Sequence, residues 1–335
     1  MTPQINPEDF YAPSEIADML KISTITVRRK LAEGAIKSRK VGRQIRVVGS
    51  DLLTWLETDN LASVGNPETT LFAEVDRYSL YKGDSLTFMA SLNPASVDMV
   101  FADPPYYLSN DGTTCYAGKR VSVNKGMWDK SAGFFEDHRF NKAWLARAQQ
   151  ILKESGTIFV SGTFHAIFSL GFAMQELGYK ILNVITWYKP NAAPNLSGRY
   201  FAHSTEFVIW AAPKENKTLK HVFNYELLKK VNGGKQMRDV WFDAWAINTP
   251  PPPEKVFGKH PTQKPVELVR RCIIAATQPD GLVFDPFCGA GTTGVAALIT
   301  GRRFVGIDLD EQYLTVANKR LSEVQANPTL FNGEK

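Results

Sequence analysis

The sequence predicts an α/β fold in which a mostly parallel sheet carries helices on both faces, preceded by a small helix-turn-helix module. First, apolar runs alternate with helical stretches from residue 78 onward, a pattern typical of parallel strands joined by crossover helices. Second, four predicted strands are followed by an acid, Asp84, Asp103, Asp285 or Asp308, at the edge where open α/β sheets bind ligands. Third, the first 57 residues contain a strongly basic segment.

The basic segment belongs to a compact unit of short helices and a wing. In order, the sequence predicts a helix at Pro13–Leu20, a helix capped by Ser23 and ended by Gly34, a wing at Val41–Val47 and a helix at Ser50–Glu57. Between Lys21 and Arg46, nine Lys or Arg stand against one acid, Glu33, so this segment carries +8 whereas the whole chain carries +5. Such a local excess predicts a nucleic-acid contact surface.

This unit resembles the excisionase-type winged helix-turn-helix, whose second helix enters the major groove of DNA. The resemblance implies DNA contacts from the basic residues of that helix and of the wing, which are Arg28, Arg29, Lys30, Arg43 and Arg46. A protein-interaction domain that uses the same helix pair is the alternative.

After a polar stretch at 58–74, the large domain begins. Its predicted elements are a strand at Tyr78–Lys82, a strand at 97–102, a helix at 140–153, a strand at Thr157–Ser161, a helix at Ala166–Leu177, a strand at Ile181–Tyr188 and a strand at Thr205–Ala211. The last of these is expected to pair antiparallel with its predecessor. The insertion at 108–134 carries several glycines and is expected to form a lid, or else a surface insertion without that role.

The strand at 97–102 leads directly into Asp103-Pro104-Pro105-Tyr106. The two prolines fix their own φ angles, so this turn is stiff. A carboxylate, a fixed carbonyl and an aromatic face together suit the exocyclic amino group of a nucleobase. We hypothesise that Asp103 and the Pro104 carbonyl accept its N–H groups while Tyr106 stacks on the extruded base. An ordinary end of a strand is the alternative for this tetrapeptide alone.

A second strand, at 282–285, runs into Pro286-Phe287-Cys288-Gly289-Ala290-Gly291-Thr292 and then a helix. The two glycines allow a tight turn and a close approach to a ligand, but no third glycine completes a dinucleotide fingerprint. About 20 residues further on, a strand ends at Asp308, where an acid can bind ribose hydroxyls. A nucleoside cofactor without a long phosphate chain fits this pattern, and S-adenosylmethionine fits better than NAD.

The order of the two motifs resembles the beta arrangement of amino-group DNA methyltransferases, over residues 78–323. His260-Pro261-Thr262-Gln263-Lys264-Pro265 stands where that family carries a signature. The resemblance implies a circularly permuted, Rossmann-like sheet, with the catalytic half at 78–188 and the cofactor half at 259–323. Stretches 191–197 and 234–241 are similar to the second adenine methyltransferase of Dpn-type restriction systems, which implies GATC targets and activity on single strands.

Candidate site residues follow from the motifs and from the family match. The catalytic set is Asp103, Pro104, Pro105 and Tyr106. The cofactor set is Asp84, Asp285, Phe287, Gly289, Gly291, Thr292 and Asp308, with His260, Thr262 and Lys264 added by the resemblance. Target recognition is expected at 190–258, where cations and aromatic residues are interleaved; its predicted DNA contacts are Arg199, Lys235 and Arg238.

Composition narrows the class of protein and its compartment. Three cysteines without a C-x-x-C pair argue for a reducing cytoplasm and against a metal site. No apolar run reaches the roughly 20 residues that span a bilayer, and residues 1–9 do not resemble a secretory signal. The predicted division is a winged module at 1–57, a linker at 58–74, a methyltransferase domain at 75–325 and a tail at 326–335.

The sequence therefore predicts a site-specific adenine-N6 DNA methyltransferase in the cytoplasm, with DNA as its partner. Cytosine-N4 methylation is the nearest alternative, because that amino group presents the same local chemistry, and RNA methylation is less favoured by the motif order. A DNA-binding regulator with an inactive methyltransferase domain is the alternative from another class. A restriction endonuclease is an expected partner, and the oligomeric state, a dimer included, stays open.

Overall fold

The computed structural model describes residues 5–20, 22–32, 34, 36–42, 44–58, 69–109, 113–116, 119–122, 129–131, 133–192, 194–195, 198–214, 220–242, 246–250, 254, 258 and 263–327. Structural statements below concern these residues. Within them, no helix is both long and apolar enough to cross a membrane.

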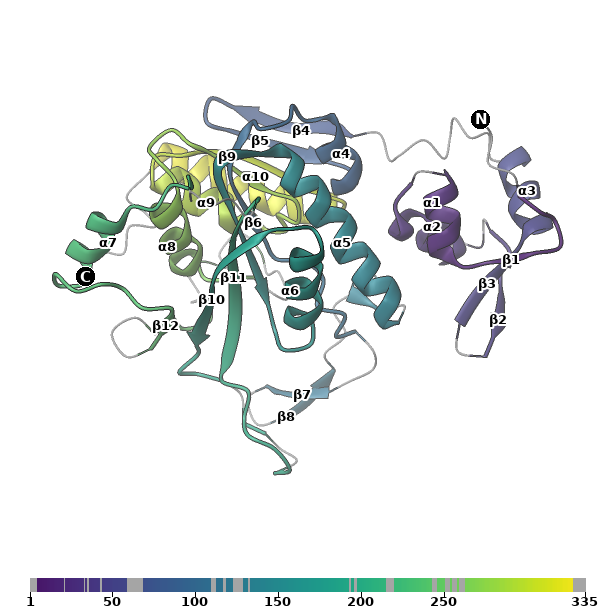
Figure 1. Cartoon of the computed structure of the whole chain (residues 1–335), viewed down its shortest axis with the longest axis horizontal. Coiled ribbons are helices and arrows are strands. Elements are labelled where there is room, and N and C mark those ends of the chain that lie inside the picture. The colour runs from purple at the N-terminus through teal and green to yellow at the C-terminus, as the bar shows by residue number, and fades with distance from the viewer. Residues whose placement is uncertain are drawn as a thin grey trace.

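The N-terminal unit has three helices and a three-stranded sheet around its own small core (Figure 1). Its elements are β1 (Phe10–Tyr11), α1 (Pro13–Leu20), α2 (Thr24–Ala32), β2 (Arg39–Val41), β3 (Gln44–Val48) and α3 (Gly49–Thr58). The helix pair is anchored by Ile16 and Val27, and the wing and last helix by Val47 and Leu52, all fully buried. The predicted helix pair, wing and final helix all form, and β1 adds a strand to the wing.

A nine-stranded sheet forms the large domain, in the order β12-β10-β11-β9-β6-β13-β14-β5-β4. The strands are β4 (Thr70–Val75), β5 (Tyr78–Lys82), β6 (Val97–Ala102), β9 (Leu152–Gly162), β10 (Lys180–Tyr188), β11 (Thr205–Ala212), β12 (Val240–Trp241), β13 (Leu282–Asp285) and β14 (Arg303–Asp308). The five strands from β9 to β5 are parallel. A separate hairpin, β7 (Thr113–Tyr116) and β8 (Lys119–Ser122), lies in the insertion.

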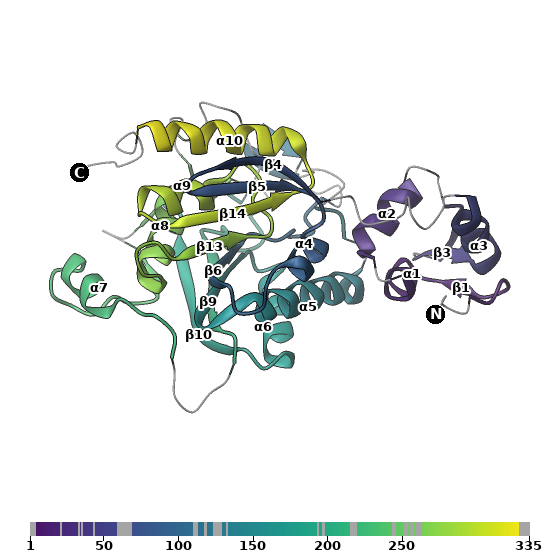
Figure 2. The same ribbon diagram turned by 90° about the horizontal axis from the view of Figure 1, so that it is seen from above.

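Helices cover both faces of this sheet, as predicted (Figure 2). They are α4 (Ser85–Ser91), α5 (Phe134–Ile151), α6 (Ile167–Glu176), α7 (Tyr225–Val231), α8 (Val266–Ala276), α9 (Thr292–Ile299) and α10 (Glu311–Ala326). One core packs under α8, α9 and α10, and the other packs under α4, α5 and α6. The layer order is therefore helix, sheet, helix.

The two halves of the large domain meet where β6 pairs with β13. The register places Val283 beside Met99 and Phe284 beside Val100, so the two strands run parallel at the centre of the sheet. Their carboxyl ends consequently lie at the same edge. Asp103 and Asp285, which follow or end these strands, come together although 182 positions separate them in the chain.

Three predicted boundaries differ from the structure: those of the linker, of the helix at 140–153 and of the strand at Thr157–Ser161, which is observed as β9 (Leu152–Gly162). The linker predicted at 58–74 overlaps β4, which pairs antiparallel with β5. As an edge strand it exposes Leu71 and Val75, so it lacks the buried apolar pattern by which a strand is recognised. The helix predicted at 140–153 begins earlier, at Phe134, and ends at Ile151 because β9 starts at Leu152.

The N-terminal module lies beside α5 in both views (Figures 1 and 2). Ser14 Oγ donates to Glu136 Oε1 at 2.7 Å, and Asp18 pairs with Arg139 at 3.4 Å. Ile25 of α2 packs against the core under α4–α6. The second helix of the module therefore faces the large domain.

We expect the packing of α9 to tolerate no added methyl group at Gly294. An added Cβ would stand 2.6 Å from the Phe304 ring and from Leu321. Gly294→Ala should therefore lower the free energy of unfolding by about 1–3 kcal/mol, measured by urea denaturation. Gly171→Ala in α6 is the matched control, because its Cβ would meet only Ile209 at 3.6 Å; helix propensity predicts up to about 1 kcal/mol of stabilisation there. Equal losses in both variants would contradict this account of the packing.

Candidate active site

A single pocket at the carboxyl edge of the sheet brings the two sequence motifs together. Because β6, β13, β14 and β5 are adjacent and parallel, the segments that follow them line one cavity. The predicted residues that line it are Asp84, Asp103, Pro104, Pro105, Tyr106, Lys264, Asp285, Phe287, Gly289, Thr292 and Asp308. The lining residues that sequence reasoning missed include Ile25 of the N-terminal module, Asp129 and Tyr313.

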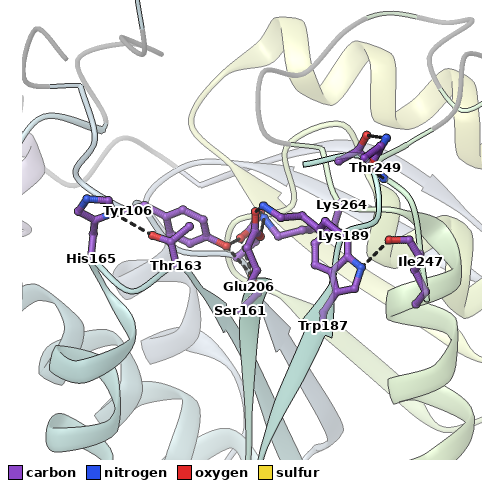
Figure 3. A network of polar contacts seen from close by, with 12 residues as sticks. Tyr106, Ser161, Thr163, His165, Trp187, Lys189, Glu206, Ile247, Thr249 and Lys264 are labelled. Carbon is purple, nitrogen blue, oxygen red and sulfur yellow. Dashed lines mark hydrogen bonds and ion pairs between the residues drawn. The ribbon is translucent and has the colours of Figure 1, made fainter. Parts of the chain in front are cut away.

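Asp103 accepts three side-chain hydrogen bonds in the pocket. Its Oδ1 accepts hydrogen bonds from the Tyr106 hydroxyl and the Ser161 hydroxyl, both at 2.5 Å. Its Oδ2 accepts from Lys264 Nζ at 2.9 Å. Figure 3 labels these three partners of Asp103, namely Tyr106, Ser161 and Lys264. Burial alone would raise the pKa of Asp103, but the Lys264 charge and these hydrogen bonds outweigh it and hold the pKa below its ordinary value. Asp103 is therefore a carboxylate at neutral pH.

Asp129 holds the loop that follows the two prolines. Its Oδ1 accepts the backbone N–H groups of Tyr106 and Tyr107 at 2.9 and 2.8 Å. Its Oδ2 accepts the backbone N–H group of Leu108 and the hydroxyl group of Ser109. Tyr107 has a positive φ of 59°, rare for a side chain of this size. The buried Asp129 carboxylate thus stabilises a strained turn and sets the place of Tyr106.

Tyr106 is both a core residue and a wall of the pocket. Its side chain is buried within the core under α4–α6, and its hydroxyl binds Asp103 and Ser161. One face of the ring carries the Lys264 ammonium, 4.9 Å from the centroid. Burial, followed by the Asp103 charge, raises the pKa of Tyr106 well above its usual range, so the phenol stays protonated and donates to Asp103.

The glycine turn is held by the acids on either side of it. Asp308 Oδ2 accepts the Gly289 N–H at 2.8 Å, and Asp285 accepts the Phe287 N–H at 2.9 Å and the Thr293 hydroxyl at 2.5 Å. Burial raises the pKa of Asp285 to about 7 and that of Asp308 to about 6. Water solvates both carboxylates poorly. A ligand that brings hydroxyl donors or a cation would stabilise their ionised forms.

Other predicted cofactor residues also have structural duties. Gly291 caps α9 with a φ of +74°, and a Cβ there would stand 2.8 Å from Ala317. Asp84 caps α4 by accepting the Thr87 N–H at 3.0 Å. The Thr292 hydroxyl accepts from Arg320 at 3.2 Å. His260 and Thr262 lie outside the described residues.

Lys264 lines the same pocket as Asp308 and Gly289. The family resemblance implied a contact with the cofactor; among the described residues, its ammonium donates to Asp103. Its second anionic neighbour is Glu206, at 3.7 Å. Glu206 is itself paired with Lys189 at 2.8 Å. Sequence reasoning missed Ser161, Glu206 and Lys189. The available signal was Glu206, a single acid at the start of the apolar run of β11. An acid in such a setting requires a charged or polar partner.

The predicted DNA contacts divide into two groups. Arg28 is half-buried against α5, where burial lowers its pKa and the charges of Asp137 and Glu136 oppose that shift. The prediction that Arg28 faces DNA is therefore not met in this arrangement, because α2 turns that side toward the large domain. Arg29, Arg199, Lys235 and Arg238 are exposed, Lys30 and Arg46 are half-buried, and Arg43 lies outside the described residues.

Aromatic and imidazole rings gather just beyond the carboxyl end of β9. Phe164 stacks on His203 with centroids 4.5 Å apart, and contacts His165 at 3.8 Å. Tyr200 lies 5.3 Å from His203 and is largely exposed. This cluster stands three residues after Ser161, the partner of Asp103.

We expect loss of the Asp129 carboxylate to destabilise the pocket loop. Asp129→Asn replaces an oxygen that accepts N–H groups by an amide donor, so buried N–H groups lose their acceptor. The free energy of unfolding should fall by about 2 kcal/mol or more, measured by urea denaturation. Asp9→Asn, at an exposed position, is the matched control and should change stability by less than about 0.5 kcal/mol. An unchanged midpoint for Asp129→Asn would refute the role given to it.

Comparison with known proteins bears on both parts of the chain. Residues 97–319 match a family model described as DNA methylase, and residues 10–60 match one described as a helix-turn-helix domain. The chain is 50% identical over 242 residues to the type II methyltransferase M2.DpnII of Streptococcus pneumoniae, covering 72% of this chain and 88% of that protein. It is 45% identical over 259 residues to M2.MboI of Moraxella bovis, covering 76% and 90%.

Solved structures agree with these matches. The M1.HpyAVI–SAM complex aligns with a TM-score of 0.53 at 26% identity, covering 73% of this chain and 98% of that one. The PvuII DNA methyltransferase, described as cytosine-N4-specific, aligns with a TM-score of 0.58 at 18% identity, covering 79% and 98%, and supports the fold alone. The predicted α/β fold and methyltransferase class are thereby confirmed, and the chain belongs to the DNA methylase family.

Proposed function

We propose that this chain transfers the methyl group of S-adenosylmethionine to the exocyclic N6 of adenine at a specific site in DNA. The observation that carries the proposal is the single pocket that joins Asp103–Tyr106 to the glycine turn. One edge of the sheet thus supplies an ionised acceptor for an amino group and, beside it, a buried and a half-buried acid around a tight turn. Membership of the DNA methylase family supports DNA as the substrate.

The residues of the cofactor side fit S-adenosylmethionine. Asp285 is buried and Asp308 is half-buried, and their carboxyls suit ribose hydroxyls and the ammonium of an amino acid. Gly289, which lines the pocket, leaves the turn without a side chain where the ligand must approach. Gly291 is not among the lining residues; it begins α9 and packs closely against α10. When bound, the cofactor supplies an electrophilic methyl group on its sulfonium. The related M1.HpyAVI has been solved as a complex with it.

On the target side, the protein positions an amino nitrogen and stabilises its developing charge. The ionised Asp103 accepts one N–H, and the Pro104 carbonyl accepts the other, so the nitrogen lone pair is directed toward the methyl donor. Both interactions strengthen as positive charge develops on nitrogen, which is the condition for lowering a barrier. The Tyr106 ring offers a face for the base after it leaves the stack.

Adenine is favoured over cytosine by the acid at the start of the tetrapeptide and by similarity to M2.DpnII and M2.MboI. The fold does not choose between the two bases, since a cytosine-N4 enzyme shares it. The same similarity supports a GATC-like target, acceptance of single strands and a role beside a restriction endonuclease.

DNA contacts are assigned to both parts of the chain. In the large domain, Arg199, Lys235 and Arg238 are exposed, and the cluster of Phe164, His203 and Tyr200 offers ring faces to unstacked bases. The N-terminal module is the proposed DNA-binding unit, and the large domain, which begins with β4, is the proposed methyltransferase unit. In the module, Arg29 is exposed and Arg46 is half-buried.

Asp103→Ala tests the proposed catalytic role. We expect the turnover number to fall at least about 10²–10³-fold, because the main acceptor for the amino group is lost, while the dissociation constant of S-adenosylmethionine stays unchanged. Transfer of a labelled methyl group to a GATC-containing oligonucleotide measures the rate, and digestion to nucleosides identifies the product. N4-methylcytosine would contradict the adenine assignment; near-normal turnover of the variant would contradict the role of Asp103. Tight DNA binding without any product from the wild type would favour an inactive regulator.

Cofactor affinity should depend on pH through Asp285 and Asp308. Their pKa values, about 7 and about 6, lie above those of the unfolded chain, so ionisation opposes folding, and stability from these groups is lost as pH rises through 6–7. A ligand that binds only the ionised carboxyls should therefore bind more tightly as the pH rises through this interval. Calorimetric titration from pH 5.5 to 8.5 should show affinity rising with pH, and Asp285→Asn should flatten the dependence. Affinity that is level across this interval would contradict the assignment.

A further inference from the structure

The Lys264 ammonium lies among three groups that attract a cation. It is 2.9 Å from Asp103 Oδ2, 3.7 Å from Glu206 Oε2 and 4.9 Å from the centroid of the Tyr106 ring. Only 7% of its side chain is exposed. Burial opposes its charge, but Asp103, Tyr106 and Glu206 outweigh burial and raise the pKa of Lys264 well above its usual range. It is therefore a permanently charged group at the centre of the target side (Figure 3).

The Lys264 ammonium occupies the place beside Asp103 that the proposed target amino group must take. Asp103 Oδ1 already accepts two hydroxyl donors, and Oδ2 accepts the ammonium. One face of the Tyr106 ring also carries the ammonium. A base that engages Asp103 Oδ2 and this face of Tyr106 must consequently displace Lys264.

An acceptor for the displaced ammonium is already present. Glu206 Oε1 binds Lys189 at 2.8 Å, whereas the buried Oε2 accepts no hydrogen bond among the described residues. A buried carboxylate oxygen without a donor is rare, because it gives up water without compensation. The free Glu206 Oε2 therefore indicates a donor that binds it in another state of the enzyme. Lys264 Nζ, at 3.7 Å, is the nearby ammonium that can become this donor.

We propose that Lys264 is a displaceable counter-ion that moves from Asp103 to Glu206 when the target amino group enters, and so acts as a positioning residue. The proposal rests on the proposed function. No proton moves in this step: Lys264 remains an ammonium, and Asp103 and Glu206 remain carboxylates. Without DNA, Lys264 keeps the buried Asp103 ionised; with DNA, the amino nitrogen and its developing positive charge take over that task.

Glu206→Gln tests the acceptor. The neutral amide holds an ammonium less well, so Lys264 should stay on Asp103 and compete with the base. We expect the turnover number to fall at least tenfold and base extrusion, followed by 2-aminopurine fluorescence in the oligonucleotide, to weaken. The dissociation constant of S-adenosylmethionine should stay within twofold, and Glu206→Asp should restore part of the turnover. Glu154→Gln, in the exposed pair with Lys220, is the matched control and should behave as the wild type.

Lys264→Met tests the counter-ion. Asp103 loses the charge that lowers its pKa, so the acid limb of the turnover–pH profile should move to higher pH by at least one unit, with turnover within threefold of the wild type at the alkaline end. Lys220→Met is its control. Thermal melting of each variant verifies folding, and Glu206→Gln keeps the test informative should Lys264→Met not fold.

Two results would overturn the proposal. One is unchanged turnover in Glu206→Gln; the other is a tenfold loss of S-adenosylmethionine affinity in Lys264→Met without a shift of the pH profile, which would make Lys264 a cofactor ligand. A wild-type chain that methylates no DNA would instead overturn the proposed function, so the two failures are distinguishable.

Discussion

The parallel pairing of β6 with β13 is the constraint on which the rest of the site depends. Parallel neighbours end at the same edge of a sheet, so the residues that follow them share one cavity. Here the register sets Val283 beside Met99, and this places the Asp103 turn next to the glycine turn. Two peptides from opposite ends of the large domain thus become the two walls of one pocket.

Within this pocket the buried charges have opposite tendencies. On the cofactor side, burial raises the pKa values of Asp285 and Asp308, and the surrounding backbone N–H groups do not offset it. On the target side, Lys264 and two hydroxyls hold the pKa of Asp103 below its ordinary value. In the same low-polarity environment, Asp285 and Asp308 therefore have raised pKa values, whereas Asp103 is a carboxylate at neutral pH.

The N-terminal module contributes to this pocket as well as to the fold. Ile25 of α2 lines the cavity and packs on the core under α4–α6, and Arg28 lies against the first turn of α5. The helix that the resemblance assigns to the major groove is thus turned toward the catalytic domain. Contact with DNA through Arg28 requires that this face be released.

By itself the sequence determined the α/β class, the order of the two halves and the motifs at the strand ends, because prolines, glycines and acids after apolar runs act locally. The edge strand β4 was not predicted from the sequence, because its exposed side chains give no pattern of buried apolar residues. Only the tertiary structure decided that Lys264 pairs with Asp103, 161 positions away, and that Glu206 lies 3.7 Å from the same ammonium. Such contacts are set by strand order and helix packing, which no local pattern encodes.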